Sequence, residues 1–117
     1  MNSMLEQKSR VSIRSVRPAA RLRLFCFPYA GGGASLYRSW SESVPSDIEV
    51  AAVQLPGREW RIHDGLVGSM TVLAADALNS IKPYLDKPFA LLGTSMGGTL
   101  IFELARQLRS QGLPEPI

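Results

Sequence analysis

The segment that most constrains the fold is the pentapeptide Gly-Thr-Ser-Met-Gly at positions 93–97. A Gly-x-Ser-x-Gly segment between a strand and a helix is typical of a nucleophile elbow, a strained strand-to-helix turn that exposes its serine. The glycines two residues before and after the serine let neighbouring backbone pass close to the turn. The apolar run at 88–92 predicts the strand, and apolar residues at helical spacing over 100–108 predict the helix. Ser95 is therefore a candidate nucleophile.

Strands and helices alternate along the rest of the chain. Alternating and β-branched residues predict strands at 21–27 and 48–54, and a third strand at 88–93 leads into the elbow. A helix capped by Ser69 is expected over the apolar stripe that follows it, and Ser35 can cap a shorter helix. This alternation favours an α/β fold with a parallel sheet and right-handed crossovers, because each crossover helix packs back on the sheet.

The candidate site lies where the loops of this sheet meet. In parallel sheets, ligands bind beyond the carboxyl ends of the strands, and three loops are expected there: those after Phe27 and Gln54, and the elbow. Acyl transfer needs two backbone N–H groups directed at the oxyanion of the tetrahedral intermediate. Met96 would supply one N–H, and Ala30 or Gly31 in the glycine-rich loop would supply the other.

Charge is unevenly distributed along the chain. The net charge is +3 at pH 7, but residues 1–23 carry six basic side chains and one acidic side chain. The remainder is therefore slightly acidic, and no nucleic-acid partner is expected. The basic segment lacks the apolar core of a secretory signal. We expect residues 1–20 to form a disordered leader and residues 21–117 to form one domain.

Hydropathy and cysteine content argue against a membrane protein and against a disulfide-bonded protein. No apolar run approaches the ~20 residues of a membrane span, so no membrane association is expected. Cys26 is the single cysteine, which excludes an internal disulfide. Its place in an apolar strand favours a buried structural thiol over a catalytic one. A reducing, cytoplasmic location is expected for such a chain.

Three sequence blocks occur together in an order and spacing that resemble a known family. The blocks are Leu-Phe-Cys-Phe-Pro-Tyr-Ala-Gly-Gly at 24–32, Val-Gln-Leu-Pro-Gly-Arg-Glu at 53–59 and the elbow at 93–97. They resemble the type II thioesterases, α/β-hydrolases that accompany nonribosomal peptide and polyketide synthases. The resemblance runs from about Pro18 to Ile117. It departs at Thr94, where the family usually has histidine.

The resemblance implies a reaction and a partner. It implies hydrolysis of acyl or aminoacyl thioesters on the phosphopantetheine arm of carrier proteins, through an acyl-enzyme at Ser95. It also implies an oxyanion site formed by the backbone of Ala30 and Met96, with no metal or bound cofactor. In this fold the first predicted strand lies between the second and the third. A generic esterase fragment is a weaker alternative, because such enzymes more often carry His-Gly-Gly-Gly in the first loop.

The other two members of a catalytic triad have no evident counterpart. In α/β-hydrolases the triad follows the order Ser, Asp or Glu, His, whereas Glu103 and Glu115 are the acidic residues after Ser95 and no histidine follows it. Glu103 is interpreted as a solvated surface carboxylate on the predicted helix. His63, the single histidine, is either a stand-in base or, as we favour, an exposed loop residue beside Asp64.

The pattern therefore predicts a truncated α/β-hydrolase. Asp76 and Asp86 precede the serine and are interpreted as ordinary surface charges. We expect the N-terminal portion of a thioesterase, inactive as this chain alone and completed by a C-terminal complementing chain. The alternative is a non-catalytic remnant or a carrier-protein interaction module.

Overall fold

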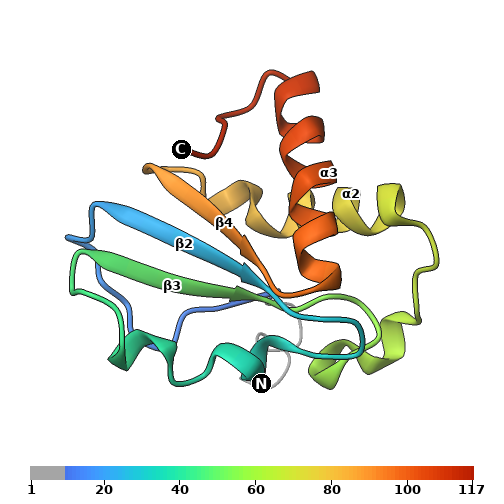
Figure 1. Cartoon of the computed structure of the whole chain (residues 1–117), viewed down its shortest axis with the longest axis horizontal. Helices are drawn as coiled ribbons and strands as arrows, with labels where there is room; N and C mark the ends of the chain where they lie inside the picture. The colour runs from blue at the N-terminus through green and yellow to red at the C-terminus, as the bar shows by residue number, and fades with distance from the viewer. Residues whose placement is uncertain (1–9) are drawn as a thin grey trace.

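A four-stranded sheet forms the centre of the computed structural model, which describes residues 10–117 (Figure 1). The strand order is β1-β3-β2-β4. β2 pairs in parallel with both β3 and β4, whereas β1 is antiparallel to β3. The bounds of the strands are β1 Val11–Ser12, β2 Leu22–Phe27, β3 Ile48–Val53 and β4 Phe89–Gly93.

Within residues 10–117, two α-helices and four short 3-10 helices accompany the strands. The bounds of the α-helices are α2 Met70–Ile81 and α3 Met96–Ser110, and those of the 3-10 helices are η1 Ala34–Tyr37, η2 Trp40–Glu42, η3 Glu59–Asp64 and η4 Lys82–Tyr84. The Ser69 side chain caps α2 by accepting a hydrogen bond from the Val72 N–H at 3.3 Å, as predicted. Helix α3 ends before Gly112, whose φ of +68° is typical of a helix terminus.

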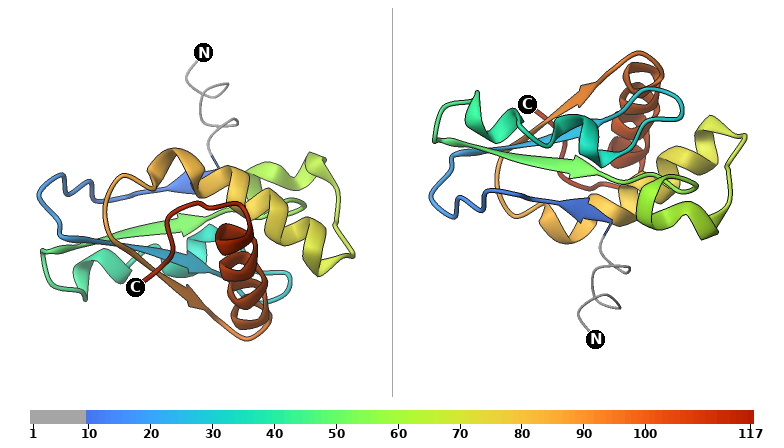
Figure 2. Two further views of the ribbon diagram at one scale, coloured as in Figure 1. Left: turned by 90° about the horizontal axis from the view of Figure 1, so that it is seen from above. Right: turned by 90° about the horizontal axis from the view of Figure 1, so that it is seen from below.

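Side-chain alternation along the strands builds a core on each face of the sheet. On one face, Phe25, Phe27 and Phe89 pack against α2 and α3. On the other, Cys26 and neighbouring strand residues pack against η1 and the adjoining segment, including Tyr37. The views in Figures 1 and 2 show the two α-helices on one side of the sheet and η1 and η2 on the other. A sheet covered on both faces is the arrangement expected for parallel strands.

The predicted architecture is confirmed for the three parallel strands. The first strand lies between the second and the third, in the predicted order, and each observed strand starts and ends within two residues of its predicted bounds. The order differs from the expectation by β1, which adds an antiparallel edge next to β3 (Figure 2). The short helix that Ser35 was expected to cap is instead two 3-10 helices, and Gly33 occupies the N-cap of the first.

The expectation of a disordered leader over residues 1–20 does not hold for residues 10–20. Val11 pairs with Val53 in the sheet. The Arg17 N–H donates to Glu49 Oε2 at 2.7 Å, and the Arg17 guanidinium donates to main-chain carbonyls between residues 41 and 48. The prediction rested on the composition of the segment itself, whereas these contacts are made with β3 and with the residues before it. The part of the predicted leader at 1–9 lies outside the described residues.

The outer edge of β4 is open. Within residues 10–117 no strand pairs with that edge. The segment after α3 returns to the start of β4, where the Ile117 N–H donates to the Phe89 carbonyl at 2.9 Å (Figure 1). A shallow apolar hollow lies beside this edge, and its lining includes Leu91, Ile101 and Phe102. Phe102 is 76% exposed, so this face of α3 presents apolar surface to solvent.

Candidate functional site

Ser95 lies in the strained turn between β4 and α3. Its φ of +56° and ψ of −114° are unfavourable for a residue with a side chain, and the residue is exposed. A Cβ at Gly93 would lie 2.1 Å from the Gly97 carbonyl oxygen, and a Cβ at Gly97 would lie 2.4 Å from the Phe27 carbonyl oxygen. Both positions therefore require glycine, and this is the geometry that Gly-x-Ser-x-Gly predicts.

Two backbone N–H groups, those of Met96 and Ala30, have no acceptor within the described part of the chain. In the first turn of α3, Gly97 N–H donates to Thr94 and Gly98 N–H donates to Ser95, which leaves the Met96 N–H unused. The N–H of Ala30, in the loop after β2, is likewise not taken by any described residue. Helix N-termini present N–H groups that stabilise negative charge. These are the two N–H groups predicted from the sequence as oxyanion donors, and that role stays a prediction.

The elbow and the loop after β2 are joined through η1. The Thr94 N–H donates to the Phe27 carbonyl at 3.0 Å, and the Tyr37 hydroxyl donates to the same carbonyl at 2.7 Å. The Tyr37 hydroxyl also lies 2.6 Å from Thr94 Oγ1. Tyr37 is buried against Trp40 in an edge-to-face contact. Thr94 therefore takes part in a hydrogen-bond network at the position where the family usually has histidine.

A second set of hydrogen bonds joins the loop after β3 to η1. The fully buried Gln54 donates through Nε2 to Glu59 Oε1 at 3.1 Å and accepts the Ala34 N–H at 3.0 Å. Glu59 Oε2 accepts the Ser35 hydroxyl at 2.6 Å and the Ser35 N–H at 3.3 Å. Sequence analysis did not assign a role to Gln54 or Glu59. The signal was present, because both belong to the block at 53–59 that carries the family resemblance.

Burial raises the pKa of Glu59, but the hydrogen bonds from Ser35 and Gln54 and the nearby charge of Arg38 outweigh it and hold the pKa below its ordinary value. Glu59 is therefore ionised at neutral pH. Its carboxylate holds a fixed negative charge next to the glycine-rich loop, and Arg38 is the cation that faces it.

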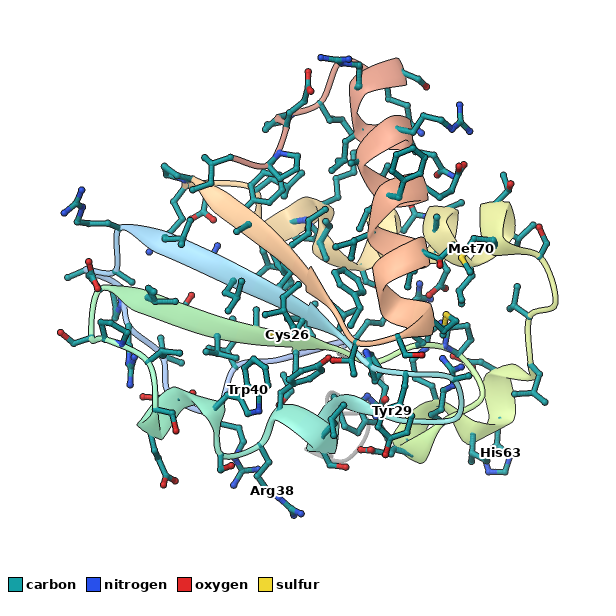
Figure 3. The ribbon with its side chains drawn as sticks, viewed as in Figure 1. Cys26, Tyr29, Arg38, Trp40, His63 and Met70 are labelled. Atoms are coloured by element: carbon teal, nitrogen blue, oxygen red, sulfur yellow. The ribbon has the colours of Figure 1, made fainter. Side chains whose placement is uncertain are left out.

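His63 lies in η3, is exposed, and points away from the sheet (Figure 3). This is the exposed loop histidine that the sequence favoured over a stand-in base. The two carboxylates after the nucleophile are engaged elsewhere. Glu103 accepts hydrogen bonds from Arg106 and Gln107, which lower its pKa to about 2, and Glu115 pairs with Arg109. Neither carboxylate is hydrogen-bonded to Ser95 within the described residues.

The interpretation of Asp76 as an ordinary surface charge is wrong. Its two oxygens accept hydrogen bonds at 2.8 and 2.9 Å from the guanidinium of Arg61, which is 4% exposed. Arg61 also donates to Asp64 and to the Gln54 carbonyl. This network ties α2 and η3 to the end of β3. The sequence did not reveal it because packing brings Asp76 to Arg61, 15 positions away, with no spacing that marks the pair.

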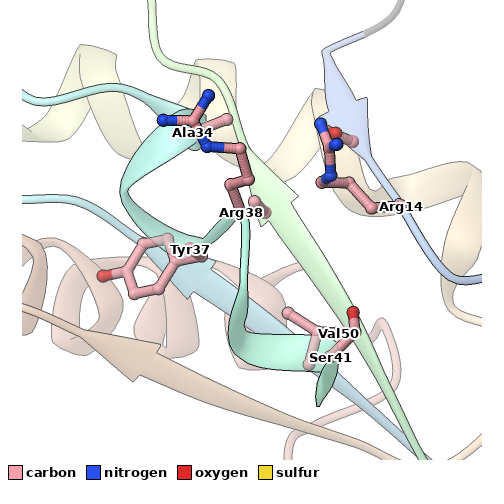
Figure 4. A pocket seen from close by; sticks show the side chains of 8 residues that line it. Arg14, Ala34, Tyr37, Arg38, Ser41 and Val50 are labelled. Atoms are coloured by element: carbon pink, nitrogen blue, oxygen red, sulfur yellow. The ribbon is translucent and has the colours of Figure 1, made fainter. Parts of the chain in front are cut away.

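Other candidate features lie away from the elbow. The buried Cys26 thiol has its pKa raised to about 12 by burial, as befits a structural cysteine. The small pocket in Figure 4 has Arg14 and Arg38 at its rim and includes no residue of the elbow. Across residues 10–117, no cluster of three histidine, cysteine or acidic side chains is placed to hold a metal ion. The same residues contain no helix with the length and hydropathy needed to cross a membrane.

Comparison with known proteins places this geometry in a family. The model of the thioesterase domain matches residues 22–115. The gramicidin S biosynthesis protein GrsT of Aneurinibacillus migulanus is 45% identical over 103 residues, covering 88% of this chain and 40% of the relative. The human medium-chain S-acyl fatty acid synthase thioesterase is 36% identical over 101 residues, covering 86% of this chain and 38% of the relative.

Solved structures agree with the sequence comparison. The RedJ thioesterase of the prodiginine pathway in Streptomyces coelicolor superposes with a TM-score of 0.80 at 41% identity, covering 86% of this chain and 40% of RedJ. The type II thioesterase BorB from the borrelidin cluster gives a TM-score of 0.81 at 34% identity, covering 92% of this chain and 44% of BorB. The chain thus spans about two-fifths of the length of these relatives. It belongs to the thioesterase family of α/β-hydrolases, and its relatives include a type II thioesterase of a nonribosomal peptide and polyketide pathway.

Proposed function

We propose that this chain carries the nucleophile half of a hydrolase that cleaves acyl or aminoacyl thioesters held by carrier proteins. The strained backbone of Ser95 is the observation that carries this proposal, because it holds the hydroxyl exposed at the end of the sheet. The Ser95 oxygen would bond to the acyl carbon while the carbon–sulfur bond breaks, and the serine proton would leave with the thiol. Water would then release the acyl group as a carboxylic acid and regenerate the serine.

The two free N–H groups supply the electrostatic part of this mechanism. Met96 N–H and Ala30 N–H, with Gly31 as the alternative to Ala30, are the proposed oxyanion donors. Donors that are already oriented need no reorganisation as negative charge develops on the acyl oxygen. Neither a metal nor a bound cofactor has a part in this mechanism.

The proposed partner is a carrier protein bearing a phosphopantetheine thioester, in the cytoplasm. Membership of the thioesterase family supports the reaction class. The type II thioesterase BorB and the gramicidin S protein GrsT are similar proteins named for pathways of this kind, which supports the partner class. The generic esterase fragment receives no comparable support.

The general base is proposed to come from a C-terminal complementing chain that docks along β4. Three observations support this arrangement: the open edge of β4, the exposed apolar side chain of Phe102, and the bond from Ile117 to Phe89 at the start of that edge. Alone, the chain is expected to be inactive.

The test is complementation. The chain is mixed with the C-terminal segment of a related thioesterase, and hydrolysis of acyl-phosphopantetheinyl carrier protein is measured beside a Ser95→Ala control. We expect negligible turnover for the chain alone, since loss of triad members leaves only about a 10³- to 10⁴-fold enhancement over water. We expect Ser95-dependent turnover for the complex, together with labelling of Ser95 by a fluorophosphonate. A folded complex that binds the carrier yet never labels Ser95 would instead identify a non-catalytic interaction module.

A further inference from the structure

Glu59 has a backbone conformation that needs an explanation. Its φ is +43°, and Glu59 and Ser95 are the two non-glycine residues with positive φ among residues 10–117. Such a conformation disfavours a side chain with a β-carbon, and it persists where surrounding contacts enforce it. The contacts made by the Glu59 side chain are hydrogen bonds from Ser35, just after the glycine-rich loop, and from Gln54.

The Glu59 carboxylate contacts the C-terminal end of the glycine-rich loop. Oε2 accepts both the hydroxyl and the N–H of Ser35, while Oε1 accepts Gln54 Nε2, and Gln54 in turn accepts the Ala34 N–H. Two successive backbone N–H groups are thus held, one directly by Glu59 and the other through Gln54. A Cβ at Gly33 would lie 2.1 Å from Glu59 Oε2, so the backbone approaches the carboxylate more closely than any other residue type allows.

The near end of the loop is fixed by a different set of contacts. The Phe27 carbonyl is held by Thr94 and Tyr37, and Gly32 N–H closes a turn on the Tyr29 carbonyl at 2.9 Å. Ala30 lies inside this turn. Its N–H is therefore positioned by restraints on both sides, from the elbow and from Glu59.

We infer that Glu59 is a positioning residue of the oxyanion site, whose carboxylate fixes the loop at Ala34 and Ser35 so that the Ala30 N–H faces the elbow. This inference deepens the proposed function and rests on it for its catalytic meaning. Glu59 restrains the loop whether or not the serine reacts. Burial raises the pKa of Glu59 less than its hydrogen bonds and Arg38 lower it, so the ionised form that accepts these bonds predominates at neutral pH.

The first experiment measures amide hydrogen exchange in this chain and its variants. Glu59→Ala is expected to speed exchange at Ala34 and Ser35 at least 10-fold, with Glu59→Gln intermediate because it keeps one acceptor oxygen. Peptides from β2 and β3 should remain protected. The matched control is Glu42→Gln in η2, a carboxylate with no hydrogen bond or ion pair to a described residue, and it should leave the loop unchanged.

Two outcomes would overturn the inference. One is unchanged exchange at the loop in both Glu59 variants. The other is an equal rise across β2 and β3, which would mean that Glu59 supports the whole fold and has no particular effect on the loop. If Glu59→Ala does not fold, Glu59→Gln is combined with Ser35→Ala in a double-mutant cycle. The non-additive change in exchange at the residue 35 amide then decides whether Glu59 restrains the loop.

The second experiment links the loop to catalysis. In the complemented enzyme, Glu59→Gln should lower kcat about 10-fold with little change in KM, a smaller effect than the ~10² to 10³-fold loss of an oxyanion donor. An unchanged kcat alongside a loosened loop would overturn the catalytic part of the inference. If the wild-type complex shows no Ser95-dependent turnover, the proposed function fails, and the exchange experiment still decides whether Glu59 positions the loop.

Discussion

The two consecutive glycines in the first turn of α3, Gly97 and Gly98, differ in the space around them. At Gly97 a Cβ would lie 2.4 Å from the Phe27 carbonyl oxygen, whereas at Gly98 the nearest heavy atom outside the local helix is 3.8 Å away. The first glycine is therefore required by the contact between the elbow and the loop after β2. The second has ordinary surroundings, although both look alike in the sequence.

Replacing each of these glycines separates the two roles. Gly97→Ala should lower the free energy of unfolding by about 1–3 kcal/mol, because the elbow must move away from β2. Gly98→Ala, the matched control, should be neutral or stabilising by up to ~1 kcal/mol, since alanine is the better helix former. Denaturant unfolding followed by circular dichroism measures both. Equal stability of the two variants would contradict the close approach of Gly97 to Phe27.

At the scale of elements, β2 and β3 are joined by a buried ion pair as well as by the sheet. Arg23 Nε donates to Glu49 Oε1 at 2.7 Å, and Glu49 is 1% exposed. The Arg17 N–H donates to the other carboxylate oxygen, which brings the segment before β2 into the same cluster. Burial raises the pKa of Glu49, but the hydrogen bonds from Arg17 and Arg23 outweigh it and hold the pKa below 4.5.

This lowered pKa predicts a pH dependence of stability. A carboxylate whose folded pKa is depressed contributes stability above its unfolded pKa of about 4.5, and that contribution is lost as the pH falls through the folded pKa. Glu49→Gln should cost about 3–5 kcal/mol at pH 7, because it leaves Arg23 partly unpaired, and should flatten the decline below pH 4.5. Glu42→Gln serves as the exposed control, and its acid profile should match that of the wild type. Parallel acid profiles for Glu49→Gln and the wild type would contradict the assignment.

At the scale of the whole molecule, the two faces of the sheet are covered but the long edge formed by β4 is not. The described residues leave β4 unpaired on its outer side, and the adjoining surface of α3 carries Phe102 at 76% exposure. An open edge beside apolar surface favours association between copies, since natural edges are usually protected by charge or proline. The opposite edge of the sheet is the short antiparallel strand β1, which pairs with β3.

The open edge predicts that the isolated chain self-associates or is partly molten. Phe102→Glu should shift the population toward monomer in light scattering, because it places a charge in the apolar face and a partner for Arg106 one turn away. Val16→Glu is the control, since Val16 is 69% exposed and lies outside this face. A wild-type chain that is already monomeric, with strong amide protection at Leu91 and Leu92, would contradict this prediction.

The sequence alone determined the features that depend on a few neighbouring residues. Apolar periodicity specified β2, β3, β4, α2 and α3, and Gly-x-Ser-x-Gly specified the strained turn at Ser95. These features are local, because hydrogen bonding, capping and steric constraint act over one or two turns of chain. The order of the three parallel strands came from the family resemblance, and the structure confirms it.

Tertiary structure decided the contacts between distant residues. Tyr37 and Thr94 are 57 positions apart, Arg17 and Glu49 are 32 apart, and no spacing in the sequence announces either pair. The ordered structure of residues 10–20 and the hydrogen bonds by which Glu59 restrains the glycine-rich loop also depend on contacts between distant residues. A hydroxyl or carboxylate finds its partner only after packing has removed water and brought separate loops together, so these interactions are properties of the folded chain.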